Sequence, residues 1–176
     1  LALSTSYDLT YAGANLSIGK KAITVTAAAK SKTYGDTDPA LTYSITTGAL
    51  VGTDAFTGSL TRDAGEAFGT YAIKQGTLVL STNYDLTYAG ADLTIGKKSI
   101  TVTAAAKSKT YGDTDPTLTY SITSGALAGT DAFTGSLTRD AGEAFGTYAI
   151  KQGTLALSTS YDLTYAGANL TIGKKA

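Results

Sequence analysis

The stretch YDLTYAGADLTI occupies residues 84–95, and close copies of it begin at Tyr7 and Tyr161. Tyr84, Leu86 and Tyr88 alternate with polar residues, and Leu93 and Ile95 alternate in the same way after Gly90. Successive side chains of a β-strand point to opposite sides of a sheet, so a period of two indicates a strand with one buried face. The stretch therefore predicts two strands separated by a turn at Ala89-Gly90.

The same alternation recurs along the chain, for example in Ile23, Val25 and Ala27 and in Leu41, Tyr43 and Ile45. Glycine, aspartate and proline lie between these runs and indicate turns. About six short strands are expected in every 77 residues. The residues expected in the core are Ile23, Val25, Leu41, Tyr43, Ile45, Phe56, Leu60, Phe68, Tyr71, Ile73, Leu78, Leu80, Leu86, Leu93 and Ile95.

The chain is an internal repeat with a period of 77 residues. Residues 1–77 and 78–154 are identical at 69 of 77 positions, and the remaining residues begin a third copy. If IleThrVal at 23–25 is a first strand, the repeats are residues 21–97 and 98–174. Residues 1–20 are then the C-terminal strands of a preceding repeat. The near-identity of the copies favours a function that gains from repetition, such as a stalk that gains length or a binding protein that gains avidity.

The composition limits the possible chemistry. The 176 residues include no Cys, His, Met or Trp, and the formal net charge is zero. Without histidine or cysteine there is no imidazole base, no thiolate nucleophile and no soft metal ligand, so we do not expect an enzyme. Balanced charge argues against a nucleic-acid partner. No apolar run is long enough for membrane insertion by a helix.

The expected fold class is mainly β, with tandem small antiparallel β-domains. An immunoglobulin-like sandwich is favoured, because Gly69-Thr70-Tyr71 follows a predicted corner, as a Gly-x-Tyr element does in such folds. The alternative is a β-grasp-like α+β fold with one short helix near residues 48–54.

The octapeptide KTYGDTDP occurs at residues 32–39 and again at 109–116. Its carboxylates, Asp36 and Asp38 with their copies Asp113 and Asp115, could share a calcium ion, which prefers oxygen ligands. The same residues are also typical of a sharp turn, in which the carboxylates accept hydrogen bonds from nearby backbone N–H groups. We favour the turn and expect no cofactor other than this candidate calcium.

Three segments that follow one another along the chain resemble the MBG-type (YGX type) repeats of large bacterial surface proteins. They are AITVTAAAKSKTYGDTDPALTYSITTGAL, FTGSLTRDAGEAFGTYAIKQGTL and YDLTYAGADLTIGK, and their hallmark is the Tyr-Gly-x element at 34–36 and 111–113. The resemblance implies a secreted adhesin at the bacterial cell surface, with roles in cell adhesion and biofilm. It implies no catalytic residues.

The leading functional hypothesis is a structural spacer that projects a distal binding region, with neighbouring repeats as its partners. A multivalent module for host or matrix glycans or proteins is the first alternative. Aromatic faces stack on sugars, and Tyr34, Tyr88, Tyr111 and Tyr165 lie near turns where they could contact a glycan. A filament subunit joined by strand addition is the second alternative. A further hypothesis is a covalent cross-link that joins a strand lysine, Lys74 or Lys151, to an Asn or Asp beside a buried acid, for which Glu66 and Glu143 are the only glutamates.

Overall fold

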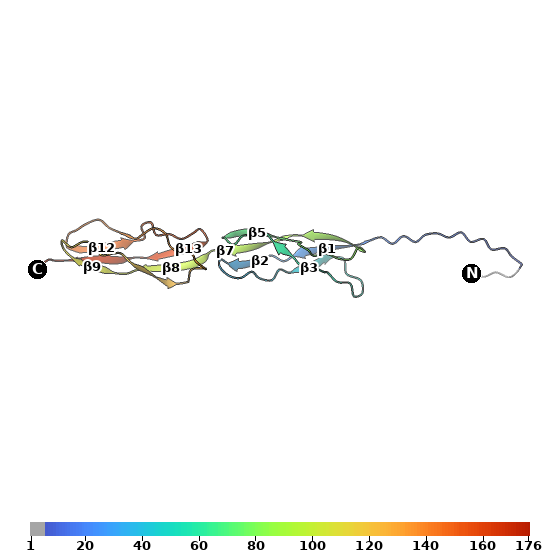
Figure 1. The fold of residues 1–176 in the computed structure, drawn as a ribbon, viewed down its shortest axis with the longest axis horizontal. Helices are drawn as coiled ribbons and strands as arrows, with labels where there is room; N and C mark the ends of the chain where they lie inside the picture. Colours follow the sequence, from blue (N-terminus) through green and yellow to red (C-terminus); the bar gives the residue numbers. More distant parts are fainter. Residues whose placement is uncertain (1–5) are drawn as a thin grey trace.

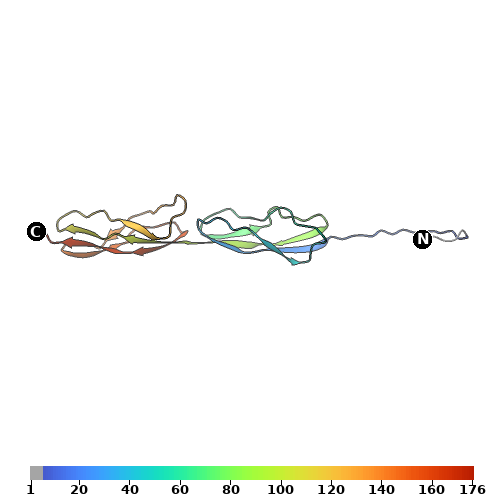
Figure 2. The ribbon, with the colours of Figure 1, turned by 90° about the horizontal axis from the view of Figure 1, so that it is seen from below.

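The computed structural model describes residues 6–176, which form two small β-domains arranged end to end (Figure 1). Strands β1–β7 make the first repeat and strands β8–β14 make the second. Residues 6–20 form no strand and lead away from the first repeat along the long axis of the molecule (Figures 1 and 2). The prediction for residues 1–5 lies outside the described residues.

Each repeat contains seven short strands among the described residues. In the first repeat they are β1 (Lys21–Ala27), β2 (Lys30–Thr33), β3 (Tyr43–Thr47), β4 (Thr61–Arg62), β5 (Gly69–Lys74), β6 (Tyr84–Ala89) and β7 (Ala91–Gly96). In the second repeat they are β8 (Lys98–Ala104), β9 (Lys107–Thr110), β10 (Tyr120–Ser124), β11 (Thr138–Arg139), β12 (Gly146–Lys151), β13 (Tyr161–Ala166) and β14 (Ala168–Gly173).

The strands of each repeat form two small sheets. In the first repeat the orders are β3-β1-β6 and β2-β7-β5-β4, and the second repeat has the equivalent sheets β10-β8-β13 and β11-β12-β14-β9. Apolar side chains of both sheets meet in one core per repeat, as a two-sheet domain requires. The prediction of a mainly β protein with tandem small domains is confirmed.

The first and last strands of a repeat run in the same direction. β1 pairs parallel with β6, and β2 pairs parallel with β7. Only residues 28–29 separate β1 from β2, and only Gly90 separates β6 from β7. The expectation of purely antiparallel pairing is therefore wrong for these pairs. Strands β3–β5 lie between them in sequence, so no hairpin forces them to be antiparallel.

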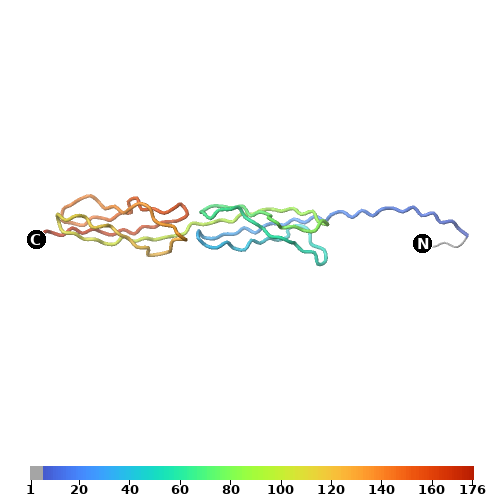
Figure 3. The backbone as a smooth tube through the Cα atoms, viewed as in Figure 1, coloured from blue at the N-terminus to red at the C-terminus, as the bar shows by residue number. Residues whose placement is uncertain are grey.

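This parallel pairing places the beginning and the end of each repeat at opposite ends of the domain. The register runs from Lys21 opposite Tyr84 to Thr33 opposite Gly96. The chain therefore enters a repeat at one end and leaves at the other, and a single linker joins the two repeats (Figure 3).

The observed core agrees in part with the core that the alternation of apolar and polar residues predicts. Ile23, Val25, Leu60, Ile73, Leu78, Leu93 and Ile95 are buried as predicted, and Leu41, Phe56, Tyr71, Leu80 and Leu86 pack on them while half-buried. Tyr43, Ile45 and Phe68 were expected inside but are 36%, 39% and 50% exposed. Tyr43 and Ile45 lie on β3, an edge strand whose residues are all exposed.

The helix proposed near residues 48–54 does not form. Gly48 and Gly52 have φ angles of 81° and 56°, in the left-handed region that a right-handed helix cannot contain. In fact residues 6–176 contain no helix at all, and hence none that is long and apolar enough to cross a membrane.

Candidate functional site: the joint between the repeats

The repeated Tyr-Gly element lies at the end of the first repeat that faces the second. Immediately after β2, the Asp36 N–H donates to the Thr33 carbonyl at 3.0 Å and closes a turn, as expected for KTYGDTDP. The Tyr34 N–H donates to the Gly96 carbonyl at 2.9 Å, which fixes the turn to the end of β7. We call residues 34–36 the Tyr-Gly loop.

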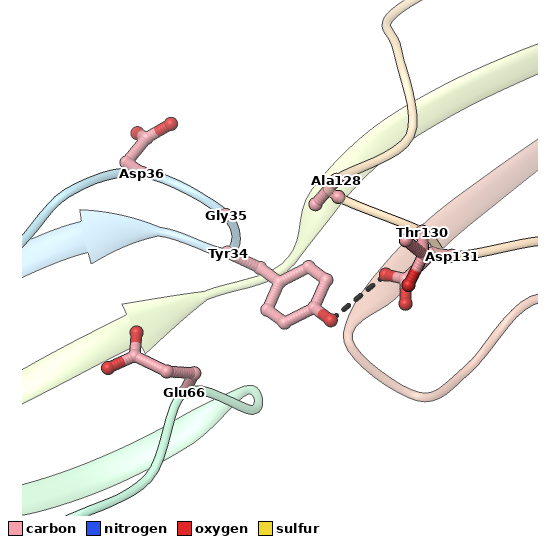
Figure 4. A pocket seen from close by; sticks show the side chains of 8 residues that line it. Tyr34, Gly35, Asp36, Glu66, Ala128, Thr130 and Asp131 are labelled. Carbon is pink, nitrogen blue, oxygen red and sulfur yellow. Dashed lines mark hydrogen bonds between the residues drawn. The ribbon is translucent and has the colours of Figure 1, made fainter.

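The side chain of Tyr34 crosses into the second repeat (Figure 4). Its hydroxyl donates to Asp131 Oδ2 at 2.9 Å, and the Tyr161 hydroxyl donates to the same oxygen at 2.6 Å. The rings of Tyr34 and Tyr161 meet edge to face with centroids 5.3 Å apart, an arrangement that aromatic pairs favour. The hydrogen bond to Asp131, together with burial, raises the pKa of Tyr34.

The receiving surface in the second repeat is built from two chain segments. The Ala128 N–H donates to the Tyr161 hydroxyl at 2.8 Å, so the loop at 128–131 is held against the start of β13. Ser160, next to Tyr161, is only 4% exposed. We call Ala128, Asp131, Ser160 and Tyr161 the acceptor site.

Gly35 is needed at the joint for two separate reasons. Its φ of 85° lies in the left-handed region, where any side chain is strained. In addition, a Cβ on Gly35 would lie 2.6 Å from the Cβ of Ala128, which is closer than two non-bonded carbon atoms can approach. The backbone of the first repeat therefore rests directly on the second.

A second contact crosses the joint beside the linker. The Phe68 N–H, in the loop before β5, donates to Ser160 Oγ at 3.1 Å. The Lys98 N–H donates to the Ser160 carbonyl at 3.0 Å, so Ser160 binds both the first repeat and the start of β8. With the covalent linker, these contacts connect the repeats at three points, which opposes bending in more than one direction.

Four charged side chains support the Tyr-Gly loop from within its own repeat. Both oxygens of Asp38 accept from Arg62, at 2.6 and 3.1 Å, and Lys32 donates to Asp38 at 2.6 Å. Glu66 pairs with both Lys32 and Arg62. Lys32 also donates to the Asp36 carbonyl at 3.1 Å, which connects the charged cluster to the loop. The second repeat has the same cluster, built from Lys109, Asp115, Arg139 and Glu143.

The cluster shifts the ionisation of its members. Hydrogen bonds from Arg62 and then Lys32 lower the pKa of Asp38 to about 2. The same partners, Lys32 first, lower the pKa of Glu66, and the Asp38 and Glu66 carboxylates raise the pKa of Lys32. All four groups are therefore charged at neutral pH. The Lys32 side chain is only 4% exposed.

The predicted calcium ligands lie in this environment. Asp38 and Asp115 have both oxygens engaged by lysine and arginine, so a cation there would have to displace those partners. Asp36 and Asp113 are exposed, and Asp36 lines a cleft of about 320 Å³ at the joint. Within residues 6–176, no group of three or more acidic side chains is arranged to hold a metal ion. Calcium binding stays a prediction.

The four tyrosines proposed as glycan contacts have different environments. Tyr88 and Tyr165 are half-buried and donate to the Ile73 and Ile150 carbonyls, each at 2.9 Å, so the expected exposure of Tyr88 is not observed. Tyr34 is half-buried in the joint, again contrary to expectation. Tyr111 is 53% exposed. Glycan binding stays a prediction.

The proposed cross-link lacks the buried acid that it needs, because Glu66 and Glu143 are 63% and 61% exposed. Lys74 forms an ion pair with Asp63, and Lys151 pairs with Asp140, while Glu66 and Glu143 belong to the charged clusters. Sequence reasoning missed the acceptor site, since it placed Tyr161 only in a predicted strand, and Asp131 and Ser160 belong to no recognisable motif. One signal was available: residues 21–97 and 98–174 differ at only seven positions, and two of them, Val51/Ala128 and Asn83/Ser160, lie at this site.

Comparison with known proteins gives one assignment. The profile of the MBG domain (YGX type) matches residues 23–94 and again residues 100–171. No curated protein matches the chain, and no solved structure does. The two matches cover most of the sequence and coincide with the two sets of strands, and each includes one Tyr-Gly element. The chain therefore belongs to the MBG domain family of YGX type and contains two tandem copies of the domain.

Proposed function

We propose that these repeats are a stiff spacer in a bacterial cell-surface adhesin, exported from the cell, and that they hold a distal binding region away from the surface. The single observation that supports this most directly is the docking of Tyr34 and Gly35 on Ala128, Asp131 and Tyr161. A spacer needs domains that keep their relative orientation, and this joint provides contacts on both sides of one short linker.

The strand topology supports the same proposal. Because the first and last strands are parallel, each repeat adds its full length to an array instead of folding back. The segment β6–β7 covers residues 84–96, and at about 3.3 Å per residue it spans roughly 40 Å. Each further repeat would extend the protein by about that distance.

In this proposal the partners of a repeat are its neighbours, and no catalytic role is assigned. Glycan binding is the less favoured alternative. Of the four candidate tyrosines only Tyr111 is more than half exposed, and it is the counterpart of Tyr34, whose ring contacts another repeat. Its exposure is thus consistent with a docking residue whose acceptor lies elsewhere.

The stiffness is testable by distance measurements across the joint. The chain has no cysteine, so Ser44→Cys and Ser121→Cys, at equivalent exposed positions of β3 and β10, place two spin labels without background. Pulsed electron resonance is expected to give one narrow distance distribution, unchanged by calcium or a chelator. A broad distribution would contradict a stiff spacer, and a change on chelation would support the calcium hypothesis.

The cellular location needs a separate test. Antibodies against the repeats should label intact cells of the source bacterium, and external protease should remove that labelling. A cytoplasmic protein serves as the control for cell integrity. Labelling only after lysis would contradict the surface assignment and leave the stiffness of the joint untouched.

A further inference from the structure

The first repeat has its own acceptor site at the end that faces away from the second repeat. The Tyr84 hydroxyl donates to Asp54 Oδ2 at 2.6 Å, and the Val51 N–H donates to the Tyr84 hydroxyl at 2.9 Å. The equivalent hydrogen bonds of Tyr161 with Asp131 and Ala128 measure 2.6 and 2.8 Å, so the two sites have the same geometry. A cleft of about 610 Å³ lies here, and Asp54 and Asn83 are exposed where Asp131 and Ser160 are covered.

The segment that leads away from this site has the sequence of the last two strands of a repeat. Residues 6–20 match residues 160–174 at every position except Ser17, which replaces Thr171. In the repeats, the equivalents of Leu16 and Ile18 are fully buried, whereas Leu16 is 87% and Ile18 is 89% exposed. Such side chains need the rest of an MBG core to cover them.

We propose that the outer end of the first repeat, at Val51, Asp54, Asn83 and Tyr84, is a docking site for the Tyr-Gly loop of another MBG repeat, whose last two strands are residues 6–20. The inference rests on the proposed function, because it treats the observed joint as a device that recurs. It names both the partner and the element of the partner that binds.

The geometry of the observed joint explains why an MBG repeat fits this site. Residues 19–21, which lead into β1 at Lys21, line the cleft, just as residues 96–98 form the linker of the joint. A repeat completed by residues 6–20 would therefore present its Tyr-Gly loop to Asp54 as the first repeat presents Tyr34 to Asp131. The Asp54 carboxylate, which already accepts from Tyr84, would accept from the incoming tyrosine as well.

Two residues would make this second joint looser than the first. At the observed joint, Gly35 lies against Ala128 with no room for another carbon atom. Val51 adds two methyl groups at the equivalent place, and Asn83 replaces the serine hydroxyl that accepts from Phe68. The positions 51/128 and 83/160 are thus specificity positions, which set how closely a neighbouring repeat can approach.

The test supplies the remaining strands of the proposed repeat. Fusion of a copy of residues 98–154 in front of Leu1 makes residues 1–20 the end of a full repeat, because residues 155–170 and 1–16 are identical. The chain has four valines, so the methyl signals of Val51 can be assigned with Val51→Ala. Val51 is 57% exposed, and its broadening by a soluble paramagnetic agent is the measurement.

The expected result is that Val51 loses part of its broadening in the extended protein, since its counterpart Ala128 is half-buried at the observed joint. In the matched control, the added copy of Gly112 is replaced with alanine, and Val51 should stay accessible. Gly112→Ala in the original chain shows whether a repeat tolerates this change, since nothing lies within 4 Å of its Cβ position.

Two outcomes would overturn the inference. One is a Val51 that stays accessible in the folded extended protein. The other is concentration-dependent protection of Val51 in the original chain, which would mean that a separate molecule binds there. Both are distinguishable from failure of the spacer proposal, which the distance distribution between positions 44 and 121 tests independently.

Discussion

The Tyr-Gly loop at residues 34–36 and its counterpart at residues 111–113 lie in the same eight-residue sequence but have different surroundings. In the first repeat, Tyr34 is half-buried against Tyr161, and Gly35 touches Ala128. In the second repeat, Tyr111 is 53% exposed and Gly112 has nothing within 4 Å of its Cβ position. The φ angles of the two glycines are nevertheless 85° and 90°. The loop conformation is therefore a property of each repeat, and docking adds a rigid body to a loop that is already formed.

This comparison makes Gly35 and Gly112 a matched pair for mutation. Either glycine replaced with alanine should destabilise its own repeat by about 1–2 kcal/mol, because of the left-handed backbone. Only Gly35→Ala should also separate the repeats, because its Cβ collides with Ala128. Thermal unfolding should show a loss of stability in both variants, larger for Gly35→Ala because it also loses the joint, while the distance distribution between labels at 44 and 121 should broaden for Gly35→Ala alone. Equal broadening in both variants would refute the docking explanation.

The next largest effect on the distance distribution is expected when residues are exchanged at the specificity positions 51/128 and 83/160. The double substitution Ala128→Val with Ser160→Asn gives the observed joint the residues of the outer site. We expect the mean distance between the labels to lengthen and its distribution to widen, because the valine methyls prevent close approach of Gly35. The reverse exchange in the first repeat, Val51→Ala with Asn83→Ser, is the control and should leave the distribution unchanged.

Removal of one hydroxyl should have a smaller effect. Tyr34→Phe keeps the ring against Tyr161 and removes the hydrogen bond to Asp131, which should cost the joint about 0.5–1.5 kcal/mol. Tyr111→Phe is the matched control, with no partner lost among the described residues. The measurement is hydrogen exchange of the Phe68 amide, which donates across the joint to Ser160. The exchange should accelerate for Tyr34→Phe and stay constant for Tyr111→Phe.

A fall in pH should reduce the stability contributed by the charged cluster of each repeat, and by the same amount in both. This is the smallest of the expected effects. The pKa values of Asp38 and Asp115 are lowered to about 2 from an ordinary value of 3.8. Groups with a lowered folded-state pKa stabilise the fold above the unfolded pKa, and this contribution disappears as pH falls from about 4 towards 2. Unfolding by denaturant between pH 5 and pH 2 should show this loss.

Asp38→Asn and Asp115→Asn should each reduce the pH dependence, and by similar amounts. Both carboxyl groups are about 40% exposed, so screening by solvent keeps each contribution modest. A much larger effect in one copy would show that its cluster also supports the joint.

The sequence predicts the strands better than it predicts the joint. Alternation correctly places Ile23, Val25, Leu93 and Ile95 inside, because these strands have one covered face. It fails for Tyr43 and Ile45, whose strand alternates equally well but lies at a sheet edge, where Phe56 covers only part of Tyr43. Periodicity shows which residues share a face and leaves open whether that face is covered.

The joint was not predictable for a different reason. Tyr34 and Tyr111 have identical neighbours in sequence, so no local rule can assign one to an interface and the other to solvent. The turn in KTYGDTDP follows from its residues, whereas its partner, Asp131, lies 97 residues away in another copy. The only local trace was the cluster of differences at positions 51/128 and 83/160, whose meaning depends on three-dimensional contacts.

The parallel pairing of β1 with β6 also determines how a repeat would respond to force. When a chain is stretched from its two ends, β1 is pulled towards one end, while β6, continuous with β7, is pulled towards the other. The six paired positions from Lys21–Tyr84 to Thr26–Ala89 are then loaded in shear, so their hydrogen bonds share the load and must break together. Forced unfolding is governed by the rate of this step, so a domain with little core would still resist extension well.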